Sequence, residues 1–461
     1  MNLTLPVDQQ ALRDRYSFAT LVRPLTGLVQ HPIALREEIG TPVFEIAVAD
    51  LGNLTMAFPH VATPFGTDAR NEALGGAGAD IDAERAWVRA VAEAAERYAC
   101  TVYAEEDFVV TSARELGNQA LDFARLPRLS EREYADPHCP FQRPNSAVPI
   151  RWTRGYSLVD RCERYVPAIM THLYMSAREG ERFWAPISTG VAAHTDLATA
   201  LVSAICEVIE RDAIALTWLA RLQLPRIELD DALPEALAAN YARLRRSLVH
   251  QIFFDATTDL GIPTVYALQL VDGHPRMAQY VNCATDFNPA AACAKTIREA
   301  APARVVLQLD RDLPESVADF ASLHEGAVYH GRSGHSDAFA FLLESDARRS
   351  LTAMEIDAPV DAQGRLRLLL ERLRALDMEV IAVDLTTDEV RVAGLWVVRV
   401  VIPDLMPMTP LHRARYLGPP TTLSLPGGSR LWEAHGRTCE PGTTAIRMTS
   451  YEESVGDDHF C

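Results

Sequence analysis

The chain has 461 residues, of which 48% are hydrophobic and 23% are charged, a composition typical of a folded globular protein. Its formal net charge of −18 argues against a broad electrostatic grip on nucleic acid or anionic lipid, so we expect neither as a partner. Eight cysteines lie far apart with no Cys-x-x-Cys pair, and the first residues lack the pattern of a signal peptide. These features predict a cytoplasmic protein with reduced thiols.

The first half of the chain predicts two helices, each preceded by a turn. Residues 1–60 form a strand-containing segment with runs such as PVFEIAVAD. The Gly-rich stretch LGGAGADIDAER predicts a turn that opens a helix at about 83–105, with Asp82 as its N-cap. Residues 126–155, rich in Pro, Arg and Ser, predict a loop. A second turn, PISTGVAAHTD, precedes a long apolar helix at about 196–220.

The second half alternates strands and helices. The stretches TVYALQLVD and PRMAQYVNCA predict adjacent strands joined by a turn at Gly273. A helix follows in NPAAACAKTIREAA, and another near 361–376 leads to the strands MEVIAVDL and LWVVRVVIP. His324, His330 and His335 lack the spacing of metal ligands and are expected to be loop residues.

The helix at 196–220 is apolar enough to be weighed as a membrane span. Glu207, Glu210, Arg211 and Asp212 lie at its centre, where each charge would cost roughly 2.5–3.5 kcal/mol in a bilayer. The sequence therefore predicts a helix buried inside a globular fold.

Both long helices carry the order Glu-x-x-Glu-Arg, in VAEAAERYA and ICEVIERDA. The spacing places Glu93 with Glu96, and Glu207 with Glu210, on one helix face. One interpretation is a solvated face with Glu–Arg pairs worth roughly 0.2–0.5 kcal/mol each. The apolar flanks favour a second, in which enclosed carboxylates with surplus negative charge face each other across a Mg²⁺–phosphate site. These residues alone leave both interpretations open.

Three segments resemble signatures of YcaO-domain proteins. GGAGADIDAERAWVRAVAEAAERYA and STGVAAHTDLATALVSAICEVIERDAIALTW resemble the two signature segments, and NPAAACAKTIREAAPAR is similar to the later nucleotide-site helix. The resemblance runs from about residue 60 to 410, and the GGAG opening is similar to YcaO cyclodehydratases of thiazole/oxazole-modified microcin synthetases. It implies an α/β YcaO fold with mixed sheets, and ATP and Mg²⁺ bound on facing helices. No GxxxxGK[ST] phosphate loop is present, as this family implies.

The same resemblance implies boundaries and site residues. The boundaries are an N-terminal segment at 1–60, a YcaO domain at 61–445 and a C-terminal tail at 446–461. The expected catalytic, metal-holding residues are Glu93, Glu96, Glu207 and Glu210. Nucleotide contacts are implied for Arg97, Ser203, Arg211, Lys295 and Glu299.

Lys295 is the only lysine in the chain and stands where the family has arginine, four residues before Glu299. The C-terminus lacks the proline-rich tail of many azoline-forming members, so the carboxylate of Cys461 is a further catalytic candidate, as a base. His459 could also act as a base, but we interpret it as a histidine of a disordered terminus.

Several positions depart from the family pattern. Arg89 stands where serine is frequent, Thr199 where many members have a metal-binding glutamate, and Ala192 and Thr195 replace polar residues of the second turn. Two alternatives follow: either Asp196, one turn before Thr199, partly substitutes for that glutamate, or this ligand is missing. These departures leave a scaffold subunit with a weakened nucleotide site as an alternative to the enzyme.

The implied activity is that of an ATP-dependent peptide cyclodehydratase. A Cys, Ser or Thr side chain of a ribosomally made precursor peptide adds to a backbone amide carbonyl, the oxyanion attacks the γ-phosphate of ATP, and phosphate then leaves an azoline ring. External sulfide or an amine as the nucleophile gives the alternative products, a thioamide or an amidine. The implied partners are the precursor peptide, a leader-binding ubiquitin-activating-enzyme-like protein and a flavin-dependent dehydrogenase, around a homodimer within a larger complex.

Overall fold

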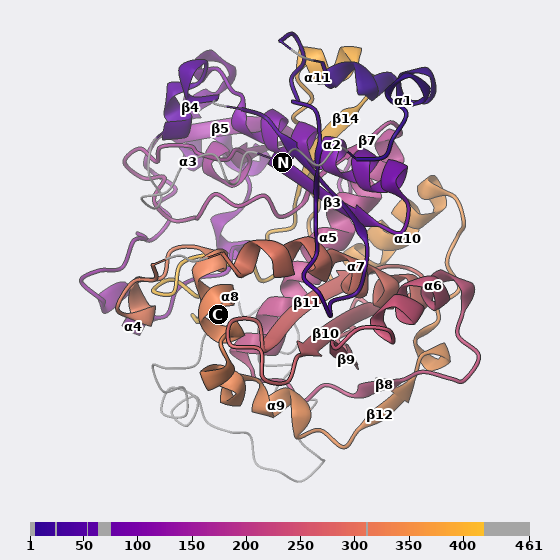
Figure 1. Cartoon of the computed structure of the whole chain (residues 1–461). Helices are drawn as coiled ribbons and strands as arrows, with labels where there is room; N and C mark the ends of the chain where they lie inside the picture. The colour runs from indigo at the N-terminus through magenta and orange to yellow at the C-terminus, as the bar shows by residue number, and fades with distance from the viewer. Residues whose placement is uncertain (1–4, 24, 53, 63–74, 310–311, 419–461) are drawn as a thin grey trace.

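The computed structural model describes residues 5–23, 25–52, 54–62, 75–309 and 312–418, and within these ranges three sheets enclose and flank the long helices (Figure 1). The tail at 446–461, with His459 and Cys461, lies outside the described residues. A base at the C-terminus therefore stays a prediction, as do the domain boundaries near 60 and 445.

The three sheets are largely antiparallel. One runs in the order β1–β2–β3, a second in the order β11–β10–β9–β8–β12, where β12 joins β8 in parallel, and a third in the order β4–β5–β13–β14–β7, where β6 pairs with β5. The strands are β1 Ile33–Leu35, β2 Glu45–Asp50, β3 Gly75–Asp80, β4 Val109–Thr111, β5 Ile150–Ser157, β6 Cys162–Pro167, β7 Val191–His194, β8 Arg226–Glu228, β9 His250–Asp255, β10 Thr264–Leu270, β11 Gln279–Thr285, β12 Arg348–Ser350, β13 Ile381–Asp384 and β14 Trp396–Val401.

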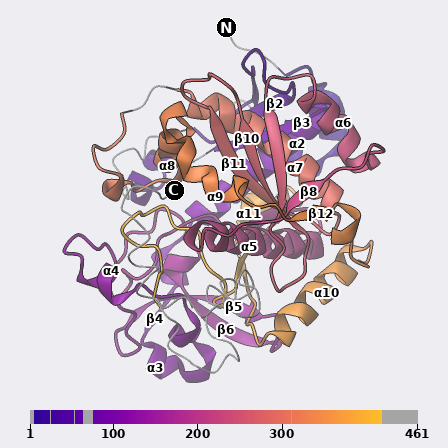
Figure 2. The ribbon, with the colours of Figure 1, turned by 90° about the horizontal axis from the view of Figure 1, so that it is seen from below.

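Three long helices are each shared by two sheets. Helix α2 (Ala83–Thr101) packs on β2 and β3 and also on β7 and β14. Helix α5 (Leu197–Leu219) packs on β7 and β14 and also on β10 and β11, and Figure 2 shows it crossing the middle of the molecule. Helix α7 (Pro289–Leu307) packs on β10 and β11 and also on β3. The three helices therefore converge at the centre of the fold.

Shorter helices complete the outer layers. Of these, α10 packs against α5, and α6 packs against α7. Their bounds are α1 Gln9–Arg15, α3 Ala113–Leu116, α4 Glu131–Ala135, α6 Glu235–Leu244, α8 Leu323–Gly331, α9 Ala340–Leu343, α10 Ala362–Ala375 and α11 Asp388–Val392.

The Gly-rich stretch before α2 is a strand, so the predicted turn is wrong. It forms β3, and α2 lies directly against it. A Cβ on Gly76 would stand 2.0 Å from the carbonyl oxygen of Ala90, and one on Gly78 would stand 2.2 Å from that of Ala86. Glycine is needed at these positions because any side chain would collide with the helix backbone. Close approach of a helix to a strand therefore explains the glycines, and a turn does not. The helix itself is confirmed and begins with Asp82 as its N-cap.

Helix α5 confirms the predicted buried helix. It begins at an Asp196 cap, which accepts a hydrogen bond from the Thr199 amide, and most of its residues are buried. Its central charges have partners, as with Asp212, whose carboxylate accepts from the Met406 amide at 2.9 Å. None of the helices in the described part of the chain combines the length and the apolar run that a bilayer crossing requires.

Two predicted loops contain regular structure because capping boxes begin short helices there. The predicted loop at 126–155 contains α4, opened by Ser130 with Glu133, and the start of β5. Likewise Ser322 with Glu325 opens α8, which carries His324 and the buried His330. The predicted turn PISTGVAAHTD ends in β7.

The remaining elements lie within a few residues of their predicted positions. The β10–β11 pair is an antiparallel hairpin, and Gly273 in its connection has a φ of 71°. Helices α7 and α10 and the strands β13 and β14 also form where their patterns place them.

We expect Gly78→Ala to destabilise the protein by about 1–3 kcal/mol or more, because the added methyl group meets α2 backbone. Thermal unfolding monitored by circular dichroism measures the loss. Gly334→Ala is the matched control, since a Cβ at Gly334 meets no atom within 4 Å. Equal melting temperatures for Gly78→Ala and the wild type would contradict this account of the helix–strand contact.

Candidate active site

The two glutamates of α2 are each fixed by a backbone amide of a neighbouring strand. Glu93 Oε2 accepts a hydrogen bond from the Ala77 N–H of β3 at 2.8 Å, and its Oε1 lies 3.1 Å from the Arg97 guanidinium. Glu96 Oε1 accepts from the Ala193 N–H of β7 at 2.8 Å. The first pair therefore bridges two different sheets.

The two glutamates of α5 are held in the same way. Glu207 Oε2 accepts from the Gly190 N–H at 3.0 Å, and its Oε1 accepts from Arg211 at 3.2 Å. Glu210 Oε2 accepts from the Thr285 N–H at the end of β11 at 3.2 Å. All four predicted metal-holding residues thus have one carboxylate oxygen tied to backbone outside their own helix.

Helix α7 adds a lysine and a fifth carboxylate. Lys295 Nζ lies 3.0 Å from Glu210 Oε2 and 3.9 Å from Glu299 Oε1, and Arg211 lies 3.7 Å from Glu210 Oε1. Burial disfavours the charged ammonium, but the charges of Glu210 and Glu299 outweigh it and raise the pKa of Lys295 above its usual value. Lys295 therefore stays protonated and links α7 to α5.

The protonation of Glu96 depends on glutamates of both helices. Burial, together with the charges of Glu93 and Glu207, raises the pKa of Glu96 to about 8, although the Ala193 N–H opposes the shift. The carboxyl of Glu96 thus holds a proton at neutral pH in the protein alone. The glutamates of the two helices are consequently close enough to interact electrostatically.

Other residues singled out in the sequence lie at the edge of this cluster or outside it. Ser203 is exposed on α5, one turn before Glu207. Asp196 Oδ1 accepts from both the amide and the hydroxyl of Thr199, so the structure gives Asp196 the role of a helix cap. Arg89 pairs with the buried Asp80 at 3.2 Å.

One buried cation was missed in the sequence. Arg399 of β14 is 4% exposed, and the charge of Glu207 acts on its guanidinium. The signal that could have found it is an arginine at an alternate position of the otherwise apolar strand LWVVRVVIP, since alternation places it on an inner face of the sheet. The backbone donors of Ala77, Gly190 and Ala193 had no sequence signal.

A cavity opens beside the cluster. It has a volume of about 390 Å³, and Glu210, Arg211 and Glu299 form part of its lining. Aromatic side chains, among them Trp218 and Phe339, form another part. A ligand that contacts the charged cluster therefore has room for an uncharged part beside it.

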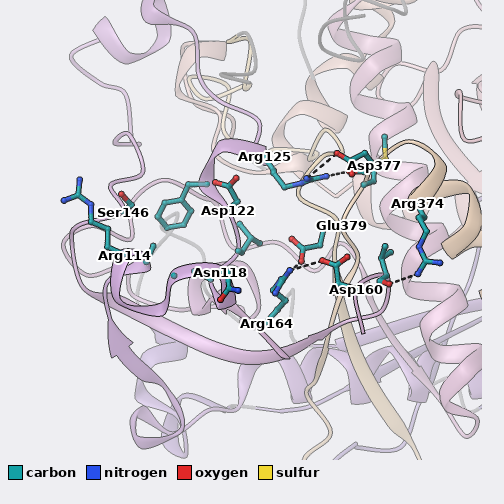
Figure 3. A pocket seen from close by; sticks show the side chains of 17 residues that line it. Arg114, Asn118, Asp122, Arg125, Ser146, Asp160, Arg164, Arg374, Asp377 and Glu379 are labelled. Carbon is teal, nitrogen blue, oxygen red and sulfur yellow. Dashed lines mark hydrogen bonds and ion pairs between the residues drawn. The ribbon is translucent and has the colours of Figure 1, made fainter. Parts of the chain in front are cut away.

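A second cavity of about 620 Å³ shares no lining residue with the cluster. Figure 3 shows its charged side chains paired with each other: Arg164 with Glu379 at 2.7 Å and with Asp160 at 2.9 Å. Arg125 in the same lining pairs with Asp404 at 2.9 Å. Acidic and basic side chains therefore pair with each other in this cavity.

The cluster fits a divalent cation by its chemistry. Its side chains offer hard carboxylate oxygens, and burial together with the charges of Glu93 and Glu207 holds a proton on Glu96 whose place a cation could take. Within the described ranges, no three His, Cys, Asp or Glu side chains stand ready as a complete ligand set. Mg²⁺ commonly keeps several waters and shares phosphate oxygens, so a few carboxylates suffice to hold it.

The fold and the site together define an α/β protein whose cluster of charged side chains lies on the helices α2, α5 and α7 and not on a phosphate-binding loop. Residues 76–406 match the family model described as "YcaO cyclodehydratase, ATP- and Mg²⁺-binding". The match covers more than half of the chain, and the chain therefore belongs to the YcaO family. The predicted family and the predicted cofactors ATP and Mg²⁺ are confirmed.

Solved structures confirm the fold. A heterocyclase in complex with substrate and cofactor superposes with a TM-score of 0.70 at 18% identity, covering 87% of this chain and 52% of its own. YcaO from Methanopyrus kandleri, bound with AMPPCP and Mg²⁺, gives 0.57 at 16% identity, covering 86% and 89%. The E. coli microcin synthetase McbBCD complex gives 0.57 at 15% identity, covering 83% and 90%.

A sequence relative is an uncharacterised protein in the tfuA 3′ region of Rhizobium leguminosarum bv. trifolii. It is 30% identical over 171 residues, which are 34% of this chain and 39% of the relative. The chain thus spans about two fifths of that relative and about half of the heterocyclase with the TM-score of 0.70.

We expect the metal-free protein to lose stability as the pH rises from about 4.5 to about 8, because folding raises the pKa of Glu96 across this window. Below it both folded and unfolded states hold the proton, and above it folding buries an ionised carboxylate. Glu96→Gln keeps a neutral acceptor for the Ala193 N–H. The melting temperature of this variant minus that of the wild type should therefore increase by on the order of 2 °C from about pH 6 to about pH 8.

Glu106→Gln is the control for this pH series, because Glu106 is exposed. The measurement is differential scanning calorimetry in the presence of EDTA. A melting-temperature difference between Glu96→Gln and the wild type that stays constant with pH would show that Glu96 is not the titrating group.

Proposed function

We propose that this chain is the ATP-dependent cyclodehydratase subunit that forms azoline rings in a ribosomally made precursor peptide. The observation that carries the proposal is that Glu93, Glu96, Glu207 and Glu210 each have one oxygen tied to a backbone amide outside their own helix, while the charges of Glu93 and Glu207 act on Glu96. Membership of a family described as ATP- and Mg²⁺-binding cyclodehydratases supports it.

In this proposal the glutamates of α2 and α5 hold Mg²⁺, which neutralises the phosphates of ATP as the phosphoryl group is transferred. The backbone donors hold each carboxylate in place before the nucleotide arrives, so little reorganisation is needed. Arg97 and Arg211 brace Glu93 and Glu207 by pairs at 3.1 and 3.2 Å and lie beside the expected phosphates. Exposed Ser203, one turn before Glu207 on α5, is a proposed nucleotide contact at the edge of this site.

Helix α7 is the third wall of the proposed nucleotide site. Lys295 and Glu299 face Glu210 across the α5–α7 contact, at 3.0 Å for the lysine. Lysine meets a phosphate as a point charge and lacks the fork of the arginine that stands there in the family. Lys295 can therefore exchange its contact with Glu210 for one with a phosphate oxygen.

The adjoining cavity of about 390 Å³ gives the peptide a place next to the phosphates. A peptide hydroxyl or thiol there adds to the preceding amide carbonyl, the oxygen takes the γ-phosphoryl group with loss of ADP, and phosphate departs with the former amide oxygen. The net change is the loss of one water per ring. The protein's part is to orient the two reactants and exclude solvent.

The partners are proposed on the same basis. One solved relative is part of the McbBCD synthetase complex, and another carries a substrate. We therefore assign a precursor peptide and a leader-binding protein as partners, with a dehydrogenase that oxidises azoline to azole and a homodimer within a larger complex.

The test combines the chain with its precursor peptide, leader-binding partner, ATP and Mg²⁺, and follows peptide mass and phosphate release. We expect loss of one water per ring and one ATP consumed, with Glu207→Gln reducing turnover by at least about 100-fold because it removes a proposed ligand charge. Glu371→Gln is the control, because the Glu371 side chain on α10 is exposed. Exchange of oxygen for sulfur in the product would indicate a thioamide-forming enzyme, and no ATP consumption would indicate a scaffold.

We also expect Lys295→Ala to weaken ATP binding by about tenfold, and more than Arg298→Ala does. Lys295 contacts Glu210 in the cluster, whereas burial and the charge of Arg89 lower the pKa of Arg298 on the neighbouring face of α7. Titration calorimetry with ATP and Mg²⁺ compares the two variants. Equal dissociation constants would remove Lys295 from the nucleotide site.

A further inference from the structure

Arg399 is a buried cation with almost no partners. Its side chain is 4% exposed, its Nη1 donates to the Ile187 carbonyl at 2.6 Å, and its Nε has no hydrogen-bond partner. Arg97, Arg211 and Lys295 of the cluster each have a glutamate within 4 Å, whereas no carboxylate of the described residues lies that close to Arg399. A buried charge without a counter-ion costs several kcal/mol, so its presence calls for a reason.

The alternation of β14 places Arg399 on the α2 side of its sheet. Val398 and Val400 belong to the core that contains α5 residues such as Ile205, while Val397 belongs to the core that contains α2. Arg399 shares the face of Val397. The groups that act on its charge are Cys100 and Arg97 of α2 and Glu207 of α5, after burial itself. Arg399 therefore lies on the α2 side of β14, where Glu207 of α5 is near enough to act on its charge.

The carbonyl that Arg399 holds belongs to the turn that fixes Glu207. Residues 187–190 form a turn that leads into β7, and two residues of β14 hydrogen-bond to its first and last carbonyls. Arg399 donates to the Ile187 carbonyl, and the Val400 N–H donates to the Gly190 carbonyl at 2.7 Å. Gly190 then gives its own N–H to Glu207 Oε2. A Cβ on Gly190 would lie 2.4 Å from Val400 O, so the turn sits tightly on the strand.

We propose that Arg399 is a positioning residue of the carboxylate site, which fixes turn 187–190 so that Gly190 orients Glu207, and whose positive charge acts on that glutamate at longer range than an ion pair. This inference rests on the proposed function, since it assigns Arg399 to the binding of Mg²⁺ and ATP. Loss of the guanidinium frees the turn and removes a positive charge that acts on Glu207. Both effects change how strongly the glutamates hold a metal–nucleotide complex.

Arg304 provides a matched control. It is 1% exposed, also has an Nε without a partner, and its guanidinium donates to the Met277 carbonyl at 2.9 Å. Burial lowers its pKa to about 10, as it does for Arg399. After burial, the groups that act on its guanidinium are Glu38 and Tyr280, and neither is a glutamate of α2 or α5. A general effect of removing a buried arginine should therefore be the same in both.

The experiment measures binding of ATP with Mg²⁺ by titration calorimetry, and the Mg²⁺ concentration for half-saturation at fixed ATP, in Arg399→Gln, Arg399→Lys and Arg304→Gln. We expect Arg399→Gln to weaken both by at least about tenfold, the effect typical of residues that orient metal ligands. Arg399→Lys keeps the charge and should fall between Arg399→Gln and the wild type. Arg304→Gln should lose thermal stability with an unchanged affinity.

Wild-type affinity in Arg399→Gln, or an equal loss in Arg304→Gln, would overturn the proposal, and a lysine variant no better than the glutamine variant would contradict its electrostatic part. Should Arg399→Gln fail to fold, Arg399→Lys decides: weaker binding than the wild type supports the proposal, and equal binding refutes it. A wild-type protein that binds no ATP with Mg²⁺ would instead refute the proposed function.

Discussion

Four hydrogen bonds from backbone N–H groups to glutamate oxygens organise the centre of this protein. The donors are Ala77 of β3, Gly190 before β7, Ala193 of β7 and Thr285 of β11, and their acceptors stand on α2 and α5. Each bond joins a helix to a strand or to the turn before it. It forms only when the helix has one particular position along the sheet. Sharing each long helix between two sheets achieves this, because neither helix can slide without disturbing two packed faces.

Charge explains why so much structure surrounds these glutamates. Carboxylates gathered in a partly enclosed site repel each other, and the proton that Glu96 holds because of burial and the charges of Glu93 and Glu207 is the visible consequence. Cationic side chains near these glutamates reduce the repulsion: Arg97, Arg211 and Lys295 come from three helices, and Arg399 comes from a strand. In the proposed function, a doubly charged ion that arrives with a nucleotide takes the place of the proton on Glu96.

The fold is shared with proteins of low identity, whereas the proposed chemistry depends on particular contacts. At 18% identity the TM-score of 0.70 reflects backbone arrangement alone. The roles we propose for Glu207 and Lys295 rest instead on the contacts that these side chains make in this chain. Thr199 stands where the resemblance implies a glutamate, and its amide and hydroxyl donate to the Asp196 carboxylate that caps α5.

Much of the site could be predicted from the sequence because it resides in local pattern. The Glu-x-x-Glu-Arg spacing, the apolar flanks of α5 and the N-caps Asp82 and Asp196 follow from helix periodicity and capping, which act over a few residues. The same local signals misled where a glycine had a tertiary purpose, as in β3, whose glycines allow α2 to approach and do not make a turn.

Only the tertiary structure decided which distant groups meet. The sequence by itself determined that two apolar helices carry paired glutamates and that a lone lysine lies on a third helix. That Ala77, Gly190, Ala193 and Thr285 turn their amides toward those glutamates, and that Glu207 is near enough to act on the charge of Arg399, depends on how three sheets pack around the helices. Backbone amides are identical at every position, so no residue pattern distinguishes the ones that a folded chain brings to a carboxylate.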